Sequence, residues 1–151
     1  MENKILFICH GNICRSPMAE MILKHLVRQR GIADQFEIAS CAVSREEIGN
    51  PVYPPARAEL ARHGVPCEKR GARQLTRQDY QDYDYLIGMD LWNINLMKRI
   101  LGSDPQNKCY LLMEFTDRPG EVADPWYSDR FDTAYQDILE GCEGLLRHLG
   151  Y

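Results

Sequence analysis

A cysteine and an arginine six positions apart are the residues of this sequence best placed to carry chemistry. Cys9 ends the strand-like run KILFIC, a short Gly-Asn loop follows, and a helical pattern begins with Arg-Ser-Pro, whose arginine is Arg15. A thiol is a useful nucleophile only as a thiolate, which the N–H groups and dipole of a helix N-terminus stabilise. The same N–H groups can cradle a phosphate. The arrangement therefore predicts a thiolate at the floor of a phosphate-binding loop.

The other residues of this loop suit the same chemistry. The guanidinium of Arg15 can bind two phosphate oxygens at once and stay paired with them as the phosphoryl group moves to sulfur. Gly11 and Asn12 are the residues best able to take positive φ and aim successive N–H groups inward. Ser16 can cap the helix and donate its hydroxyl to the thiolate. The loop has no Gly-Lys-Ser/Thr sequence, which argues against a nucleotide triphosphatase.

A proton donor is also needed if a thiolate is to displace phosphate from an alcohol. The segment ADPWYSD (123–129) offers Asp124, followed by a proline and two aromatic residues. We predict that Asp124 is this general acid. A simple Asp-Pro turn is the alternative interpretation of the same residues.

Strand-like and helical patterns alternate about four times around these residues. This predicts one α/β domain over 1–151, with a parallel sheet, right-handed crossovers and a ligand site at the carboxyl ends of the strands, where Cys9 would lie. We expect strands at 4–9, 36–41, 83–90 and 108–114, a short extended piece at 65–68, helices at 16–30, 54–63, 91–102 and 131–149, and a loop at 115–130.

Composition narrows the classes of function. The net charge of −4 disfavours non-specific binding to nucleic acid or to anionic membranes. No apolar stretch reaches the roughly 20 residues of a membrane span, and no signal-peptide pattern is present, so we expect a cytoplasmic protein. The six cysteines include no Cys-x-x-Cys pair and do not cluster with the four histidines, so neither a disulfide framework nor a structural zinc site is expected.

Taken together, these residues resemble the low-molecular-weight protein tyrosine phosphatases. CHGNICRS (9–16) is similar to the phosphate loop of that family and DPWY (124–127) to its general-acid loop, while GNPVYPPARAELARHGV (49–65), ARQL (72–75) and DYLIGMD (84–90) resemble family segments in the same order. The resemblance implies a three-layer fold with a four-stranded parallel sheet flanked by helices. It also implies hydrolysis of phosphotyrosine in proteins or peptides, no metal or cofactor, and a monomer or weak dimer.

The resemblance further implies a role for each loop residue. Cys9 would attack phosphorus while Asp124 protonates the phenolic oxygen, and water activated by Asp124 would then hydrolyse the phosphocysteine. Asn12 and Ser16 match residues that hold the loop's shape and stabilise the thiolate. The phosphate-binding set that it implies is His10, Gly11, Asn12, Ile13, Cys14, Arg15 and Ser16.

Cys14 matches a second loop cysteine that forms a reversible disulfide with the nucleophile in many relatives. A nearby thiol can trap a sulfenic acid before it is oxidised further. The alternative, that Cys14 only packs under the loop, stays open.

Several positions around the expected cleft depart from the family pattern and bear on substrate choice. We expect His10, at a position where relatives vary, to contact substrate. Glu46 and Glu47 occupy a stretch where some relatives place an aromatic residue, which should weaken stacking and disfavour acidic peptides. Trp126 and Tyr127 remain as walls for a phenyl ring.

Three other functions are alternatives to phosphotyrosine hydrolysis. Protein arginine phosphatases resemble this chain in all catalytic residues, but they favour threonine where this loop has Ile13, which offers no hydroxyl to a guanidinium. Arsenate reductases of the same fold use two further cysteines in mid-chain, and the segment 82–93 contains none. A non-catalytic phosphate-binding module would usually lack the nucleophile or the acid, and Cys9, Arg15 and Asp124 are all present.

Overall fold

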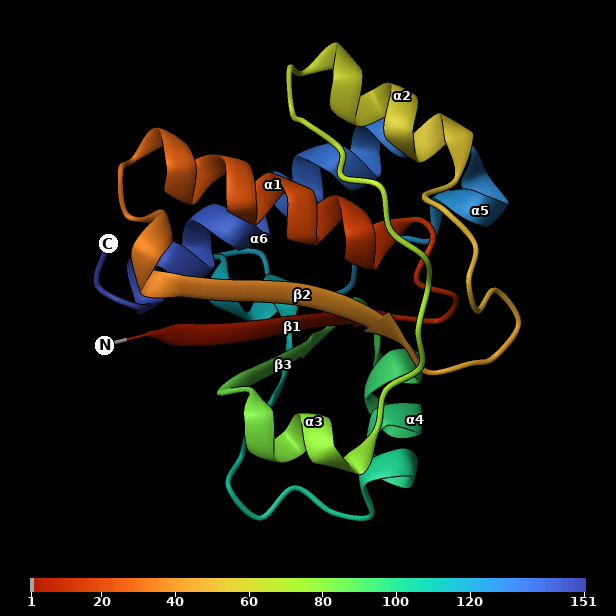
Figure 1. Cartoon of the computed structure of the whole chain (residues 1–151), viewed down its shortest axis with the longest axis vertical. Coiled ribbons are helices and arrows are strands. Elements are labelled where there is room, and N and C mark those ends of the chain that lie inside the picture. The colour runs from red at the N-terminus through yellow and green to blue at the C-terminus, as the bar shows by residue number, and fades with distance from the viewer. Residues whose placement is uncertain (1) are drawn as a thin grey trace.

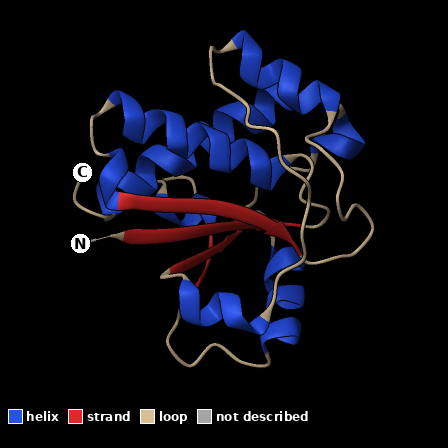
Figure 2. Ribbon diagram, in the orientation of Figure 1, coloured by secondary structure: helices blue, strands red, loops and turns tan. Residues whose placement is uncertain are grey.

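Four short parallel strands form the centre of the structure, a computed structural model that describes residues 2–151 (Figure 1). Their order across the sheet is β2-β1-β3-β4 (Figure 2). The bounds are Asn3–Cys9 for β1, Phe36–Ala42 for β2, Tyr85–Gly88 for β3 and Cys109–Leu111 for β4. β1 is a continuous apolar run that is buried from Ile5 to Cys9, as a central strand of a parallel sheet must be. The predicted four-stranded parallel sheet is confirmed.

Helices cover both faces of the sheet (Figure 1). One face carries α1 (Arg15–Gln29), α2 (Pro54–Arg62) and α6 (Phe131–His148), and the other carries α3 (Arg77–Asp82) and α4 (Leu91–Leu101); the short elements are α5 (Pro125–Ser128), η1 (Ala33–Gln35) and η2 (Leu112–Phe115). Alternate residues of β1 face two cores, with Ile5 and Phe7 on the α1–α6 side and Leu6 and Ile8 on the α3–α4 side. This is the predicted three-layer fold.

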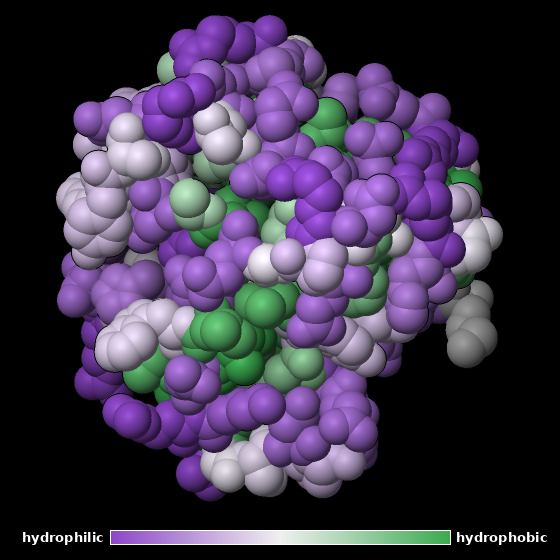
Figure 3. Space-filling view, turned by 180° about the vertical axis from the view of Figure 1, so that it is seen from behind, coloured by the Kyte–Doolittle hydropathy of each residue, from purple (hydrophilic) through white to green (hydrophobic). Residues whose placement is uncertain are grey.

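The face seen from behind is mostly polar (Figure 3). The hydrophobic side chains on it gather near the middle. No helix in residues 2–151 combines the length and the apolar character needed to cross a membrane.

The strand order places the site at the carboxyl end of β1. β1 pairs with β2 on one side and with β3 on the other, so the direction of strand succession reverses at β1. In open α/β sheets such a switch point leaves a crevice at the carboxyl edge, where ligands bind. The loops that follow Cys9 and Gly88 both leave the sheet at this edge.

Two predicted strands were too long. The strand predicted at 83–90 spans only β3, and the one predicted at 108–114 ends at Leu111 because Leu112 and Met113 turn into the core within η2. The short extended piece expected at 65–68 belongs to none of the four strands. Two isolated bridges form further along the chain, Ala42 with Gln74 and Ile48 with Ala72.

Two helices were missed. α3 begins with a capping box in which Thr76 and Asp79 satisfy each other's N–H groups, a Thr-x-x-Asp signal present in the sequence. α5 lies inside the predicted loop 115–130 and begins at Pro125, with Asp124 as its N-cap.

Candidate active site

Three polar groups converge on the sulfur of Cys9, which is 3% exposed at the end of β1. The N–H groups of Asn12 and Ser16 point at Cys9 Sγ from 3.3 and 3.4 Å. The hydroxyl oxygen of Ser16 lies 3.0 Å from the same sulfur. Donors arranged in this way stabilise negative charge on sulfur, as a thiolate nucleophile requires.

Asn12 shapes the loop behind the sulfur. It is fully buried and takes the left-handed conformation with φ of 60°. Its side-chain Nδ2 donates to Ser16 Oγ at 2.8 Å and to Ser40 Oγ at 2.9 Å. The positive φ predicted for Asn12 is therefore present.

Gly11 does not share this conformation: its φ is not positive, contrary to prediction. A Cβ at Gly11 would instead lie 3.3 Å from Glu47 Cγ. The absence of a side chain therefore serves the close packing of the loop against Glu47.

Ser16 is not the N-cap of the helix, which is a second correction. α1 starts at Arg15 with Cys14 as its N-cap, and no side chain caps it. Ser16 is the second helical residue, so its hydroxyl is free to approach Cys9 and to accept from Asn12.

The Arg15 side chain is 3% exposed and is held by two other loops. Its Nη1 donates to Asp90 Oδ2 at 2.9 Å and to the Val122 carbonyl oxygen at 2.7 Å, and its Nη2 lies 3.5 Å from Asp124 Oδ2. Burial acts to lower the pKa of Arg15, but the charges of Cys9, Asp124 and Asp90 outweigh it and raise the pKa above its ordinary value. The guanidinium therefore stays charged and oriented at the pocket.

Asp90 is a functional residue that the sequence reasoning missed. One carboxylate oxygen caps α4 by accepting the N–H of Asn93 at 2.8 Å, and the other binds Arg15. An aspartate directly after a predicted strand, on the edge that carries Cys9, was the available signal.

Asp124 faces the pocket from the start of α5. Its Oδ1 accepts the N–H of Trp126 at 3.0 Å, which leaves Oδ2 on the side of Arg15. The preceding Val122 donates its N–H to the Met89 carbonyl oxygen at 2.9 Å. The segment with the predicted acid is thus tied to the sheet edge.

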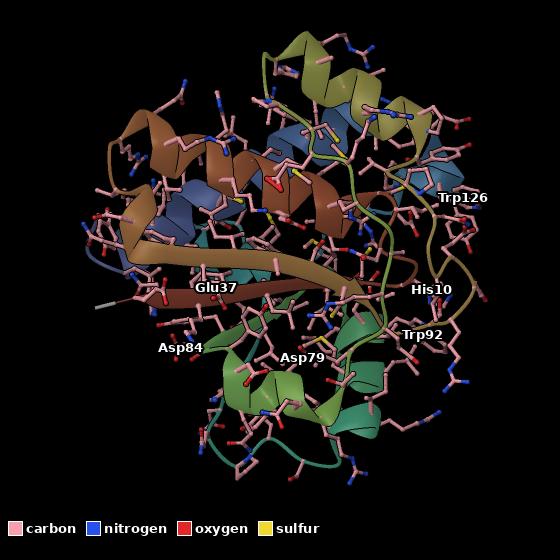
Figure 4. The ribbon with its side chains drawn as sticks, viewed as in Figure 1. His10, Glu37, Asp79, Asp84, Trp92 and Trp126 are labelled. Atoms are coloured by element: carbon pink, nitrogen blue, oxygen red, sulfur yellow. The ribbon has the colours of Figure 1, made fainter. Side chains whose placement is uncertain are left out.

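These groups surround a pocket of about 220 Å³. Its lining contains every predicted site residue except Asn12 and Ser16, which are fully buried. The lining residues are Cys9, His10, Gly11, Ile13, Cys14, Arg15, Glu46, Glu47, Asp124, Trp126 and Tyr127. Trp126 is half exposed and packs on Tyr53 with ring centres 4.8 Å apart. His10 and Trp126 lie toward the side of the molecule where the strands end (Figure 4).

One side of the pocket mouth is acidic. The imidazole Nε2 of His10 lies 3.1 Å from Glu46 Oε2, which links the phosphate loop to the loop that follows β2. Glu47 lines the pocket beside it and accepts from Asn50 Nδ2. The two glutamates therefore place negative charge on one side of the pocket.

Cys14 is a buried thiol in the wall of the pocket. Burial, reinforced by the neighbouring charges of Cys9 and Asp124, raises the pKa of Cys14 to about 12. Cys14 is therefore a neutral thiol at physiological pH, and all six cysteines are free in this structure.

Comparison with known proteins identifies the family. The family model described as "Low molecular weight phosphotyrosine protein phosphatase" matches residues 4–151. The chain belongs to this family. The resemblance found in the sequence and the enzyme class that it implies are thereby confirmed.

Individual phosphatases of the family match along nearly their whole length. The chain is 35% identical over 144 residues to the low molecular weight protein-tyrosine-phosphatase YfkJ of Bacillus subtilis, covering 94% of this chain and 92% of YfkJ. It is 35% identical over 158 residues to the human low molecular weight phosphotyrosine protein phosphatase, with the same two coverages of 94% and 92%.

Solved structures of family members agree with this fold. The crystal structure of YfkJ superposes with a TM-score of 0.94 at 34% identity and covers 99% of this chain and 95% of its own. The structure of DARP, described as a Drosophila arginine phosphatase, superposes with a TM-score of 0.86 at 34% identity and covers 98% of both chains.

Proposed function

We propose that this phosphatase hydrolyses phosphotyrosine in proteins through a phosphocysteine formed on Cys9. The observation that carries the proposal is the convergence of the Cys9 sulfur, the Arg15 guanidinium and the Asp124 carboxyl group on one pocket. These are the nucleophile, the cation and the proton donor that phosphoryl transfer to sulfur needs.

In the first step, Cys9 Sγ attacks phosphorus and the bond from phosphorus to the tyrosyl oxygen breaks. Asp124 gives its proton to that oxygen, so that tyrosine leaves as a neutral phenol. Asp90 and Val122 occupy Nη1 of Arg15, which leaves Nη2 on the pocket side for the phosphoryl oxygens. The guanidinium and the N–H groups of the loop stabilise charge on those oxygens throughout the transfer.

In the second step, water attacks phosphorus and the sulfur–phosphorus bond breaks. The Asp124 carboxylate takes a proton from this water, and inorganic phosphate leaves. Cys9 leaves as a thiolate. The N–H groups of Asn12 and Ser16 and the Ser16 hydroxyl, which lie 3.0 to 3.4 Å from its sulfur, stabilise the charge.

The pocket walls favour an aromatic phosphate ester. The indole of Trp126 and the exposed ring of Tyr127 offer faces for a phenyl group. Glu46 and Glu47 disfavour acidic residues near the phosphorylated one. A free thiol at Cys9 suits a reducing compartment, which supports the cytoplasm as the site of action. Phosphotyrosine proteins are the proposed partners, and the proposed state is a monomer or weak dimer.

Phosphoarginine is the second candidate substrate, since one structure of similar fold is described as an arginine phosphatase. Ile13 lines the pocket with an apolar side chain and so gives a guanidinium no hydroxyl to bind. This favours phosphotyrosine. Phosphate release from matched phosphotyrosine and phosphoarginine peptides measures the preference, and faster release from phosphoarginine would reverse the order.

The test is metal-free hydrolysis of p-nitrophenyl phosphate in the presence of chelator, with wild type beside Cys9→Ser. We expect turnover by wild type and none by Cys9→Ser. Turnover by both would show that Cys9 is not the nucleophile. If neither folded protein hydrolyses p-nitrophenyl phosphate, a non-catalytic phosphate-binding module is favoured, and arsenate turnover would then be measured.

A further inference from the structure

The large hydrophobic side chains that are exposed in residues 2–151 gather at one end of the sheet. They are Ile48 after β2, Leu91 and Trp92 after β3, and Trp126 and Tyr127 in α5. The candidate active site opens at the same end, and Trp126 and Tyr127 line its pocket. Single exposed hydrophobic residues are ordinary on a surface, but a group of them around a pocket indicates a surface that binds a partner.

Trp92 is the aromatic member of this group that lies outside the pocket lining. It is 65% exposed, and no aromatic contact found in residues 2–151 includes it. The buried residues of α4 are Asn93 and Met97, so Trp92 belongs to the part of the helix that faces solvent. Packing within the fold therefore does not explain an indole at this position.

The start of α4, which carries Trp92, is tied to the catalytic cation. Asp90 caps this helix and accepts from Arg15 Nη1 through its Oδ2 at 2.9 Å. The N–H of Leu91 donates to Glu121 Oε2 at 2.7 Å. Trp92 follows two positions after Asp90, so its main chain has a fixed place relative to the phosphate-binding loop.

Trp92 and Trp126 approach the pocket from opposite faces of the sheet. Trp126 packs on Tyr53 at the start of α2, whereas α4 covers the other face (Figure 1). In the view of Figure 4, His10 lies between the two tryptophans. A tyrosine ring inside the pocket leaves the rest of the substrate chain outside it, and Trp92 is an apolar ring on that outer surface which the tyrosine itself does not use.

We propose that Trp92, supported by Leu91, binds an apolar residue that flanks the phosphotyrosine of a protein substrate. The inference rests on the proposed phosphatase activity and states which phosphotyrosine proteins the same site prefers. An exposed indole gains by being covered with an aliphatic or aromatic side chain, and a ring on a fixed helix start loses little freedom when it is covered. The exposed carboxylate of Glu121 at the same helix start disfavours an acidic residue there.

The first experiment is a leucine scan of phosphotyrosine peptides. One leucine is placed in turn at each position around the phosphotyrosine of an otherwise serine-rich peptide, and release of phosphate is measured. We expect one position, or two neighbouring ones, at which leucine raises kcat/KM by about 5- to 30-fold over serine. The gain should come mainly from a lower KM, because the flanking residue does not contact the reacting atoms.

Variants of Trp92 show whether this side chain gives the gain. Trp92→Ser should reduce the gain from leucine to about twofold or less, while Trp92→Phe keeps a ring and should keep most of it. Arg99→Ser is the matched control, because Arg99 is exposed about two turns further along the same face of α4, and it should show the full gain.

The reference substrate is p-nitrophenyl phosphate, which has no flanking residues. Its kcat/KM reports whether the pocket of each variant is intact, and the melting temperature reports whether the variant is folded. If Trp92→Ser loses the same factor on p-nitrophenyl phosphate as on the leucine peptide, Trp92 acts on the pocket and not on the flanking residue, which would contradict the proposal.

Three further results would overturn it: no gain from leucine at any position, a gain that Trp92→Ser retains, or an absent gain together with a wild-type dimer that Trp92→Ser dissociates in sedimentation. The last result would assign this surface to a second copy of the chain.

Failure of the proposed function looks different, because wild type would then hydrolyse neither the peptides nor p-nitrophenyl phosphate. Calorimetry with the leucine and serine phosphopeptides tests Trp92 in that case. Tighter binding of the leucine peptide that is lost in Trp92→Ser would support the proposal, and an equal Kd for the two peptides would count against it.

Discussion

At the scale of single residues, the two carboxylate oxygens of Asp124 have different tasks. Oδ1 accepts the N–H of Trp126 and begins α5, while Oδ2 stands 3.5 Å from the Arg15 guanidinium. Asp90 holds the same guanidinium more closely, at 2.9 Å. Asp124 Oδ2 therefore has only one long contact, and it is the oxygen that we propose carries the proton for the leaving group.

Replacing Asp124 by asparagine should affect poor leaving groups most. Asn keeps the oxygen that caps α5 but has no proton to donate. We expect kcat for phenyl phosphate to fall by about 10²- to 10⁴-fold and kcat for p-nitrophenyl phosphate to fall clearly less, because only the poor leaving group needs protonation. Steady-state rates on both esters give the comparison. Equal losses would contradict the general-acid assignment.

The raised pKa of Cys14 predicts which thiol in the loop reacts. Below about pH 12 Cys14 is a neutral thiol, so its alkylation by iodoacetamide should be slow at pH 7 and rise about tenfold per pH unit. Cys9 should be labelled first at neutral pH, and peroxide should oxidise Cys9 before Cys14. Mass spectrometry of the peptides after timed labelling gives both rates. Labelling of Cys14 at pH 7 as fast as that of Cys9 would contradict the prediction.

The predictable part of the site is the part that is contiguous in sequence. Cys9 and Arg15 follow one another in a short segment whose strand and helix signals fix their geometry. Asp90 reaches Arg15 across 75 positions, and Arg70 reaches Asn12 across 58. The place of Asp90 after a predicted strand indicated the correct edge of the sheet but not its partner, and nothing local indicated the approach of Arg70. Of the two roles predicted for Ser16, the helix cap is wrong, because the start of a helix is uncertain by a residue or two in the sequence. Its hydroxyl does lie beside the Cys9 sulfur, as the other role requires.

At the scale of elements, the strands were recognised and their ends were not. An apolar run such as LLME reads as extended, yet Leu112 and Met113 bury their side chains from a turn of 3-10 helix under α6. This tertiary contact has no local signature. α3 had one, the pair Thr76 and Asp79, so that omission was avoidable.

The contact between α6 and η2 depends on glycine and gives a test of packing. A Cβ on Gly144 would collide with the Phe115 carbonyl oxygen, and one on Gly141 would lie 2.5 Å from Leu112 Cγ. Gly144→Ala should therefore destabilise the fold by about 1–3 kcal/mol, although alanine favours a helix by about 1 kcal/mol.

Thermal unfolding measures this effect, at about 2–4 °C of melting temperature per kcal/mol for a chain of this size. Gln136→Ala, on the exposed side of the same helix, is the matched control and should stay within about 0.5 kcal/mol of wild type. A Gly144→Ala protein as stable as wild type would show that η2 moves aside at little cost.

At the scale of the whole molecule, charge selects what approaches the pocket. The chain carries a net charge of −4, and Glu46 adds a carboxylate at the mouth whose side chain is 70% exposed. We expect kcat/KM to be higher for a phosphotyrosine peptide flanked by lysines than for one flanked by glutamates. Glu46→Lys should reverse that preference, mainly through KM, and added salt should reduce it by screening.

Glu37→Lys is the control for this reversal. It makes the same change of charge at an exposed site on β2, away from the end of the sheet at which His10 lies (Figure 4). An equal change in both variants would mean that only total charge matters. If Glu46→Lys leaves the peptide preference unchanged, Glu46 does not act on the peptide substrate.

The separation in sequence of the groups around Arg15 has a consequence for protein synthesis. Cys9 and Arg15 leave the ribosome long before Asp124, which lies 109 positions beyond Arg15. β1 must also wait for residue 85 before its second neighbour in the sheet exists. A nascent chain therefore carries Cys9 and Arg15 while the ribosome adds the 109 residues that end with Asp124, and the pocket can be completed only after that.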